Sequence, residues 1–495
     1  MSYPRFASAI LIVFAVVIVA ILPIQFTWVS PDSLIASTVP VASAQEESRV
    51  IEYTLRTILG QNPAMAYIGV GGDIDGQINP QLTAEVGDTV RITLINGDPV
   101  IHNLYIDEFG VATPDLIALE EQAVVEFVVD RAGEFIYYCS IPGHQPVGMF
   151  GTLLVTGESS ADAPAEPVMV HANPVPTASP ADENAVSIIR HPSDLPEPIG
   201  DREPTTLHVD LVAEEVSGQL ADGSTFHYMT FNGQVPGPMI RARVGDTIVV
   251  TLENAMSSLL PHSVDFHAVT GPGGGAVYTQ TLPGETTSFS FQALQPGLYV
   301  YHCATVSIGH HISSGMYGMI LVEPEGGLPP VDNEFYIMQG EIYTEQPFGT
   351  QGHLTFSHPD MLDEQPEYYV FNGAAGALTL DDYALRANVG ESVRIYFGVG
   401  GPNAISSFHV IGEIFDRVYD QASLTSPPLT DVQTTIVPPG GATVVEFSLD
   451  VPGRYILVDH ALSRTERGLA GYLYAEGEEN PAIFHSDGEI DNAGH

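Results

Sequence analysis

Three copies of one short motif constrain the fold of this chain more than any other feature. The copies read VGDTVRITLIN, VGDTIVVTLEN and VGESVRIYFG, and they begin at Val86, Val244 and Val389. Each starts with a Gly-containing turn and continues with alternating apolar and polar residues, the pattern of a strand with one buried face. A second marker follows each copy, and these markers read GEFIYYC, GLYVYHC and GRYILVDH. Such a repeat predicts an all-β chain built from three related β-sandwiches in sequence.

The repeats divide the chain into domains. The predicted domains are residues 46–157, 205–325 and 326–480, with a linker at 158–204 and a tail at 481–495. The linker is rich in Pro, Ala and acidic residues, a composition typical of semi-extended chain. No comparable linker separates the second and third domains, so we expect those two to pack as one body.

The first 45 residues form a separate segment. Arg5 precedes an uncharged run from Phe6 to Val29, and Ala42 and Ala44 frame a small-x-small cleavage pattern. The segment is therefore either a secretory signal peptide or a retained N-terminal membrane anchor. Both predict export, to the periplasm or the outer face of the cytoplasmic membrane. The chain has 2 cysteines, so a disulfide framework is not expected.

The charge of the chain restricts its partners. All 15 basic residues are Arg, and 61 acidic residues bring the formal net charge to -46. Such a surface argues against binding to nucleic acid or to anionic lipid. A protein that docks on it is expected to present a basic or mainly apolar face.

The first two domains each carry a Cys, two His and a Met in matching order. In proteins this is the ligand set of a blue (type 1) copper electron-transfer site. The predicted sets are His102, Cys139, His144 and Met149 in the first domain, and His262, Cys303, His311 and Met316 in the second. A buried core thiol is the alternative for one isolated Cys, and two matched copies argue against it. His310 competes with His311, but the spacing from His311 to Met316 repeats that of the first set.

Strand parity separates further side chains from these sets. Successive side chains of a strand point to opposite faces. If Cys303 faces inward, His302 must face outward. His267 lies five residues after His262 and is expected on the outward face, together with Asp265.

The third domain completes this outward set. Asp459 stands at the position of Cys303, so no blue copper is expected there, and His460 follows it with the parity of His302. His267, His302 and His460 would form a three-His metal site with an open coordination position, as a catalytic metal requires. In the first domain Tyr138 replaces the outward His, which predicts electron transfer alone.

Several of these segments resemble copper-containing nitrite reductases across residues 205–480. They are PHSVDFHAVTGPGGG, YHCATVSIGHHISSGMYG, SSFHVIGEIFD and LVDH. The first domain resembles a plastocyanin-like cupredoxin. The resemblance implies three consecutive Greek-key cupredoxin sandwiches that hold two type 1 coppers and one type 2 copper per chain. It also implies an NO-forming oxidoreductase of denitrification, in which electrons pass from the blue copper through Cys303 and His302 to the three-His copper.

The same resemblance assigns further roles. It implies that Asp265 and His409 deliver protons and that Ile411 shapes the substrate site. It implies a homotrimer in which His460, His409 and Ile411 come from the neighbouring chain, and an electron-donor protein that is a cupredoxin or a cytochrome c. Many family members have Trp or Met where this chain has His310.

Three alternatives remain. A laccase-like multicopper oxidase would need His-x-His pairs and a His-Cys-His motif, whereas this chain has His302-Cys303-Ala304 and no His-x-His pair. An electron carrier would leave the outward histidines without a role. The same fold acting on hydroxylamine or oxygen stays open.

Overall fold

The computed structural model describes residues 49–485, except residues 60–62, 64, 99, 142–143, 146–147 and 158–177. The predicted signal peptide or anchor, residues 158–177 of the predicted linker and the end of the tail lie outside this part. The described residues form mostly strands, and their only α-helices are the short α1 (Ile308–Ser313) and α2 (His358–Leu362). Neither these helices nor any other described helix has the length and apolar character of a membrane span. The predicted all-β class is confirmed.

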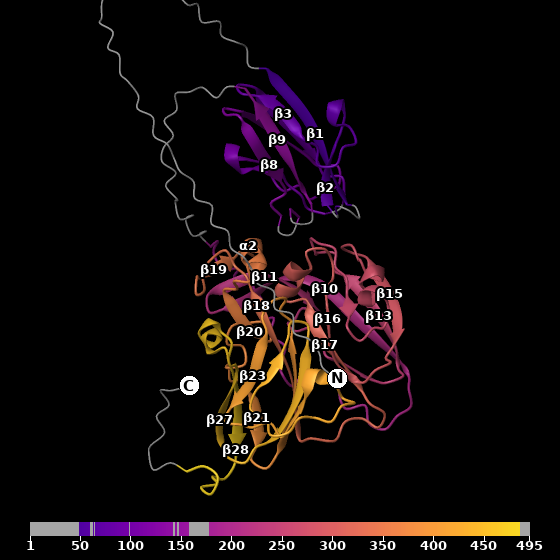
Figure 1. The fold of residues 1–495 in the computed structure, drawn as a ribbon, viewed down its shortest axis with the longest axis vertical. Helices are drawn as coiled ribbons and strands as arrows, with labels where there is room; N and C mark the ends of the chain where they lie inside the picture. Colours follow the sequence, from indigo (N-terminus) through magenta and orange to yellow (C-terminus); the bar gives the residue numbers. More distant parts are fainter. Residues whose placement is uncertain are drawn as a thin grey trace, which may run out of the picture. The chain divides into compact units, whose positions relative to one another are not determined.

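The first domain is a sandwich of two sheets, drawn in indigo to purple in Figure 1. Its strands are β1 (Val50–Leu59), β2 (Met65–Gly69), β3 (Leu82–Glu85), β4 (Thr89–Ile95), β5 (Tyr105–Ile106), β6 (Val111–Ala112), β7 (Gln122–Val128), β8 (Gly133–Tyr138) and β9 (Phe150–Thr156), with 3-10 helices η1 (Gly72–Ile74) and η2 (Asp107–Phe109). The sheets run β2-β1-β4-β7 and β3-β9-β8-β5-β6. On β4, the alternating Val90, Ile92 and Leu94 are fully buried, as the motif predicts.

The second domain has sheets β15-β13-β10-β11-β19 and β12-β17-β16-β14. Its strands are β10 (Thr206–Ala221), β11 (Ser224–Phe231), β12 (Ile240–Arg243), β13 (Thr247–Asn254), β14 (Asp265–Phe266), β15 (Thr286–Gln292), β16 (Gly297–His302), β17 (Tyr317–Glu323) and β19 (Gly352–Leu354), with 3-10 helix η3 (Pro272–Tyr278). The loop between β16 and β17 contains α1.

The third domain has sheets β20-β18-β22-β26-β24 and β21-β28-β27-β23-β25. Its strands are β18 (Asn333–Ile342), β20 (Tyr368–Phe371), β21 (Leu385–Asn388), β22 (Ser392–Val399), β23 (Ser406–Ile411), β24 (Arg417–Tyr419), β25 (Thr435–Val437), β26 (Ala442–Ser448), β27 (Gly453–Asp459) and β28 (Gly471–Glu476), with 3-10 helices η4 (Asp420–Ala422) and η5 (Leu462–Arg467).

The sequence repeat is also a repeat of topology. The three copies of the motif form β4, β13 and β22, and each pairs in parallel with the first strand of its own domain, β1, β10 or β18. Each also pairs antiparallel with the next long strand, β7, β15 or β26. The second markers form β8, β16 and β27 in the opposite sheets. The three sandwiches therefore share one fold.

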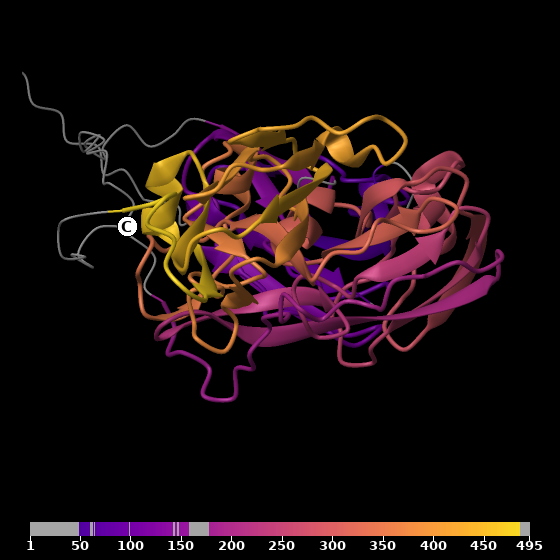
Figure 2. The ribbon, with the colours of Figure 1, turned by 90° about the horizontal axis from the view of Figure 1, so that it is seen from below.

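The second and third domains adjoin in both views of the molecule (Figures 1 and 2). Strand β19 follows β18 in the chain but pairs in parallel with β11, at the edge of the second domain's sheet. A buried ion pair joins Arg241 on β12 to Glu334 on β18, at 2.7 Å. The strand exchange and the ion pair make these two domains one body.

The segment before the second domain also lies against this body from residue 178 onward. Ile188 is fully buried, and Val186 and Ile189 form parallel bridges with Gly218 and Val235. The buried Arg190 donates to the carbonyl of Pro236 at 2.8 Å. Within the segment predicted as a linker, residues 186–190 thus pack against the body, and residues 158–177 lie outside the described residues.

Candidate metal centres

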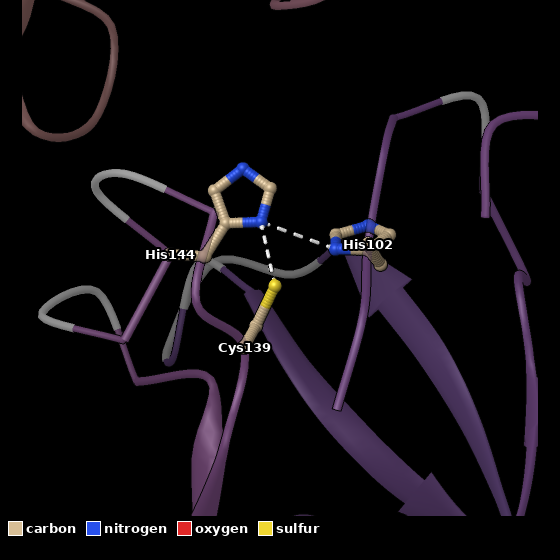
Figure 3. Close-up of side chains that lie close together, drawn as sticks. All are labelled: His102, Cys139 and His144. Carbon is tan, nitrogen blue, oxygen red and sulfur yellow. Dashed lines mark hydrogen bonds between the residues drawn. The ribbon is translucent and has the colours of Figure 1, made fainter. Parts of the chain in front are cut away.

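The first candidate centre lies at one end of the first sandwich and joins His102, Cys139 and His144 (Figure 3). The Nδ1 atom of His144 is 3.2 Å from Nδ1 of His102 and 3.4 Å from Sγ of Cys139. Cys139 directly follows β8, and His144 lies in the loop before β9. All three side chains are buried, so the three predicted ligands meet at one point inside the domain.

A buried carboxylate orients His102 toward this point. Oδ1 of Asp98 is 2.9 Å from Nε2 of His102, and Oδ2 accepts a hydrogen bond from the Thr57 hydroxyl at 2.9 Å. Because Nε2 is engaged there, the other ring nitrogen of His102 faces His144. A carboxylate behind a histidine in this way is the usual support of a metal ligand.

Backbone hydrogen bonds bring Met149 to the same point. The amide of Cys139 donates to the carbonyl of Met149 at 3.1 Å, and the amide of Met149 donates to the carbonyl of His144 at 3.0 Å. Met149 is fully buried. The chain therefore ties the predicted Met to both the Cys and the His that precede it.

The second domain repeats this arrangement. Nδ1 of His311, on α1, is 3.2 Å from Nδ1 of His262 and 3.4 Å from Sγ of Cys303. The amide of Cys303 donates to the carbonyl of Met316 at 3.0 Å, and the amide of Met316 donates to the carbonyl of His311 at 3.2 Å. All four side chains are buried. The two centres thus share side chains and backbone bonds.

Glu215, on β10, orients His262. Its Oε1 is 3.2 Å from Nε2 of His262 and also accepts the backbone amides of Leu259 and Leu260. Its Oε2 is 3.1 Å from Nε2 of His227. Burial alone would raise the pKa of Glu215, but the hydrogen bonds with the two histidines outweigh it and hold that pKa well below its usual range. Glu215 is therefore a carboxylate that supports the second centre as Asp98 supports the first.

The donor set of both centres fits copper. Two imidazole nitrogens with lone pairs cannot face each other at 3.2 Å unless a proton or a cation lies between them.

Burial raises the pKa of the Cys139 thiol to about 12. Burial acts in the same sense on Cys303, but the positive charge of His311 and His262 outweighs it and lowers the pKa of that thiol. A thiolate with two imidazoles and a thioether is the set that type 1 copper prefers, and the bound cation would stabilise the thiolate.

A third group lies on the opposite side of β16. Asp265, His267 and His302 bring one ligand atom each to within 4.8 Å of one another. Nε2 of His267 is 3.1 Å from Nε2 of His302, and Nδ1 of His302 lies 2.9 Å from the carbonyl oxygen of Cys303. Because Nδ1 of His302 donates to that carbonyl, its Nε2 offers a lone pair. Burial, and then the neighbouring His302, lower the pKa of His267, which favours its neutral, metal-binding form.

Strand parity places this group as expected. Cys303 is fully buried, whereas His302 is partly exposed; His262 is fully buried, whereas His267 is exposed. The two faces of one short strand thus carry two different groups of ligands.

His460 and His409 lie together at another place. Their ring centroids are 5.5 Å apart, and both line an open depression with Ser407, Gln433, Thr434 and Ala461. Nδ1 of His409 donates to the carbonyl of Gln433 at 2.6 Å, which leaves its Nε2 free. Ile411 is half-buried two residues further along β23, on the face of His409. In the described part of a single chain, the groups of metal-ligand type do not bring His460 to His267 and His302.

Sheet register shows that Asp265 and His409 occupy equivalent positions in their domains. Asp265 pairs with His302, the residue before Cys303, and His409 pairs with Val458, the residue before Asp459. The outward group of the third domain, with His409, therefore occupies the same place in its sandwich as the outward group of the second domain, with Asp265.

Known proteins resemble this chain in sequence and in structure. A family model described as multicopper oxidase matches residues 213–327. The copper-containing nitrite reductase of Neisseria meningitidis serogroup A is 52% identical over 299 residues, which are 60% of this chain and 77% of the relative. That of Alcaligenes xylosoxydans is 37% identical over 284 residues, which are 54% of this chain and 84% of the relative. A solved copper nitrite reductase from Nitrosomonas europaea matches with a TM-score of 0.50 and 32% identity, over 56% of this chain and 96% of that one.

These similarities agree with the geometry of the His and Cys groups. They confirm the resemblance drawn from the sequence motifs, the cupredoxin fold and the enzyme class. The chain belongs to the family of copper-containing nitrite reductases.

Proposed function

We propose that this protein reduces nitrite to nitric oxide at a type 2 copper held by His267, His302 and His460 of the partner subunit, in a homotrimer. The main support for this proposal is the placement of these three histidines in the chain. The facing Nε2 atoms of His267 and His302, 3.1 Å apart, form two thirds of a three-His set, while His460 faces an open depression elsewhere. Two complementary half-sites on one chain are what a site between identical subunits requires.

Two type 1 coppers and one type 2 copper per chain are part of this proposal. The ligands of the type 1 coppers are His102, Cys139, His144 and Met149 in residues 46–157, and His262, Cys303, His311 and Met316 in residues 205–325. When bound, copper supplies the electron and the Lewis-acidic position for the oxygen atoms of nitrite. Cys303 and His302 are consecutive residues, so one peptide unit links the two ligand sets of the second domain.

The chain itself supplies protons. Reduction of nitrite to nitric oxide and water takes one electron and two protons, which requires proton donors beside the substrate. Asp265 lies in the group of His267 and His302, and His409 holds its Nε2 free because its Nδ1 donates to Gln433. We assign the two protons to this pair, with Ile411 as the apolar wall that limits the size of the substrate.

The first domain would carry electrons into this system. In this domain Tyr138 stands where the second domain has the outward His302. The Tyr138 hydroxyl donates to Oδ2 of Asp107 at 2.9 Å. We assign this domain to electron entry from a donor protein, a cupredoxin or a cytochrome c. The N-terminal 45 residues would direct the protein to the periplasm or anchor it at the outer face of the membrane.

Metal content tests the site directly. His302→Ala and His460→Ala should each remove the non-blue copper and abolish nitrite turnover, because each removes one of three ligands. The thiolate absorption of both blue centres should persist, since their ligands are intact. Retention of the non-blue copper in either variant would contradict the proposed ligand set.

The substrate needs a separate test. Steady-state rates with nitrite, hydroxylamine and oxygen should be compared on the copper-loaded protein. We expect nitrite to be the preferred substrate, with nitric oxide as product. A higher kcat/KM for hydroxylamine or oxygen would favour the same fold acting on another small molecule.

A further inference from the structure

Asp459 takes the place in the third domain that a copper-binding thiol holds in the second. Its strand partner is Phe408, and the next pair along is His409 with Val458, the register that places Asp459 level with Cys303. Its side chain is fully buried. A buried carboxylate needs compensating partners, because an uncompensated one is strongly unfavourable.

Both oxygens of this carboxylate accept hydrogen bonds from the third domain. Oδ1 accepts the backbone amides of Ser407 at 3.0 Å and of Ala461 at 3.1 Å. Oδ2 accepts Nε2 of Gln339 at 3.1 Å and a guanidinium nitrogen of Arg464. Four donors occupy both oxygens.

Two of these bonds fix backbone near the two histidines, one at the residue after His460 and one on the neighbouring strand β23. Ala461 directly follows His460, and the amide of His460 itself donates to the carbonyl of Ser407 at 2.8 Å. Ser407 lies two residues before His409, on the same face of β23. One carboxylate therefore ties the turn that carries His460 to the strand that carries His409.

The second domain makes the corresponding bond with its thiol. There the amide of Ser263 donates to Sγ of Cys303 at 3.5 Å, where the third domain has Ser407 and Asp459 at 3.0 Å. Both domains therefore have this hydrogen bond between equivalent strands, with a thiol as acceptor in the second domain and a carboxylate in the third. In the third domain Arg464 supplies the positive charge, and it also donates to the carbonyl of Ile405 at 2.6 Å.

We propose that Asp459 is a positioning residue for the catalytic copper. Its carboxylate takes the place of the thiol as hydrogen-bond acceptor at this end of the sandwich and fixes the orientation of His460. This inference rests on the proposed function, because it assumes that His460 is the third copper ligand. A residue that only stabilises the domain would affect unfolding but not the metal.

A matched control variant exists in the second domain. Asp246 is also fully buried and accepts two backbone amides, those of Thr205 and Arg243, together with the guanidinium of Arg202. It contacts none of the proposed copper ligands through these bonds. Asp246→Ala therefore removes the same chemistry at a place without a copper role.

The test measures affinity and spectrum of the non-blue copper in full-length trimers. Asp459→Ala should weaken binding of that copper roughly 10- to 100-fold, the usual effect of losing a residue that orients a ligand. Its electron paramagnetic resonance signal should change, while both blue centres keep their absorption. Asp246→Ala should lower thermal stability to a similar degree and leave affinity and signal unchanged. Wild-type affinity and signal in Asp459→Ala would overturn the proposal.

Two further variants keep the test decisive. If Asp459→Ala yields no soluble trimer, Asp459→Asn is measured instead, since it keeps an oxygen acceptor for the two amides and replaces the charged oxygen that accepts from Gln339 and Arg464. A several-fold weaker affinity supports the proposal, and unchanged affinity overturns it. His460→Ala separates the two hypotheses: if it keeps the non-blue copper, the proposed function fails, and if it loses that copper while Asp459→Ala binds normally, only the role of Asp459 fails.

Discussion

Glu413, directly after the turn at the end of β23, is a half-buried carboxyl in an acidic setting. Burial raises its pKa to about 7, and the nearby Asp450 and Asp416 act in the same sense, while a hydrogen bond with Tyr455 opposes them. The folded protein therefore prefers the neutral form of Glu413, whereas in the unfolded chain this carboxyl ionises near its ordinary pKa of 4.5. Between these two values the folded state binds more protons than the unfolded state, so this group lowers stability as pH rises.

Glu413→Gln isolates that effect. The variant should match the wild type in unfolding free energy at pH 4, where the carboxyl is neutral in both states, and exceed it at pH 8. The difference should be modest, because solvent screens a half-exposed group. Denaturant titrations at the two pH values measure it. An equal shift at both values would show that the carboxyl does not titrate as described.

At single residues, the sequence predicted which Cys and His side chains lie together but not the carboxylates that orient two of the histidines. Cys303 and His311 lie eight residues apart in one loop, so their contact is local and could be predicted from their spacing. The sequence does not indicate Glu215 as the support of His262, because Glu215 lies on β10, distant in sequence, and only sheet packing brings it to His262. Asp98 lies four residues before His102, a short-range signal that could have been used.

At the scale of strands, a ladder of buried ion pairs crosses the second and third domains. Arg241 on β12 binds Glu334 at 2.7 Å, Glu334 binds Arg394 on β22 at 2.8 Å, and Arg394 binds Glu446 on β26 at 2.6 Å. The two arginine side chains are almost fully buried. In a chain without Lys, planar guanidinium groups can each bind two carboxylates, which suits such a ladder.

Glu334→Gln breaks the ladder at its centre. It leaves two buried cations short of a partner, so we expect a loss of about 3 kcal/mol in unfolding free energy. Glu325→Gln is the matched control, since Glu325 is largely exposed and lies 3.6 Å from Arg243. That change should cost less than about 1 kcal/mol. Similar losses in the two variants, measured by denaturant unfolding, would contradict a special role for the ladder.

Parity also explains which strand features sequence could predict. Alternation along β16 predicted that Cys303 and His302 face opposite sides, and in the structure Cys303 is buried and His302 is partly exposed. The pairing of β19 with the second domain could not be foreseen, because a three-residue strand carries too little pattern to identify its partner.

At the scale of the whole molecule, the boundary of the catalytic body lies earlier than composition indicates. A Pro- and Ala-rich stretch suggested linker up to residue 204, but apolar residues within it, such as Ile188, are buried against the body. Composition averaged over a segment hides single anchoring residues, and only the tertiary structure reveals them.

Truncation at two positions tests this boundary. A chain that starts at residue 178 keeps Ile188 and Arg190 in place, whereas one that starts at Asp201 loses both. We expect the shorter chain to be less stable by at least about 2 kcal/mol, the lower end of the cost of removing a buried Ile side chain. Both should keep the second blue centre. Equal thermal midpoints would show that residues 178–200 do not stabilise the body.

The central claim is that each catalytic copper is shared by two subunits, and mixed trimers test it most directly. His302→Ala and His460→Ala chains, with different affinity tags, are coexpressed, and trimers that carry both tags are isolated. Each parent alone should be inactive. In mixed trimers a site is intact wherever a chain with His302 meets a neighbour with His460, which happens at one of the three interfaces, so trimers that carry both tags should recover about a third of wild-type activity and non-blue copper. Mixed trimers as inactive as the parents, with their blue centres intact, would contradict a site between subunits.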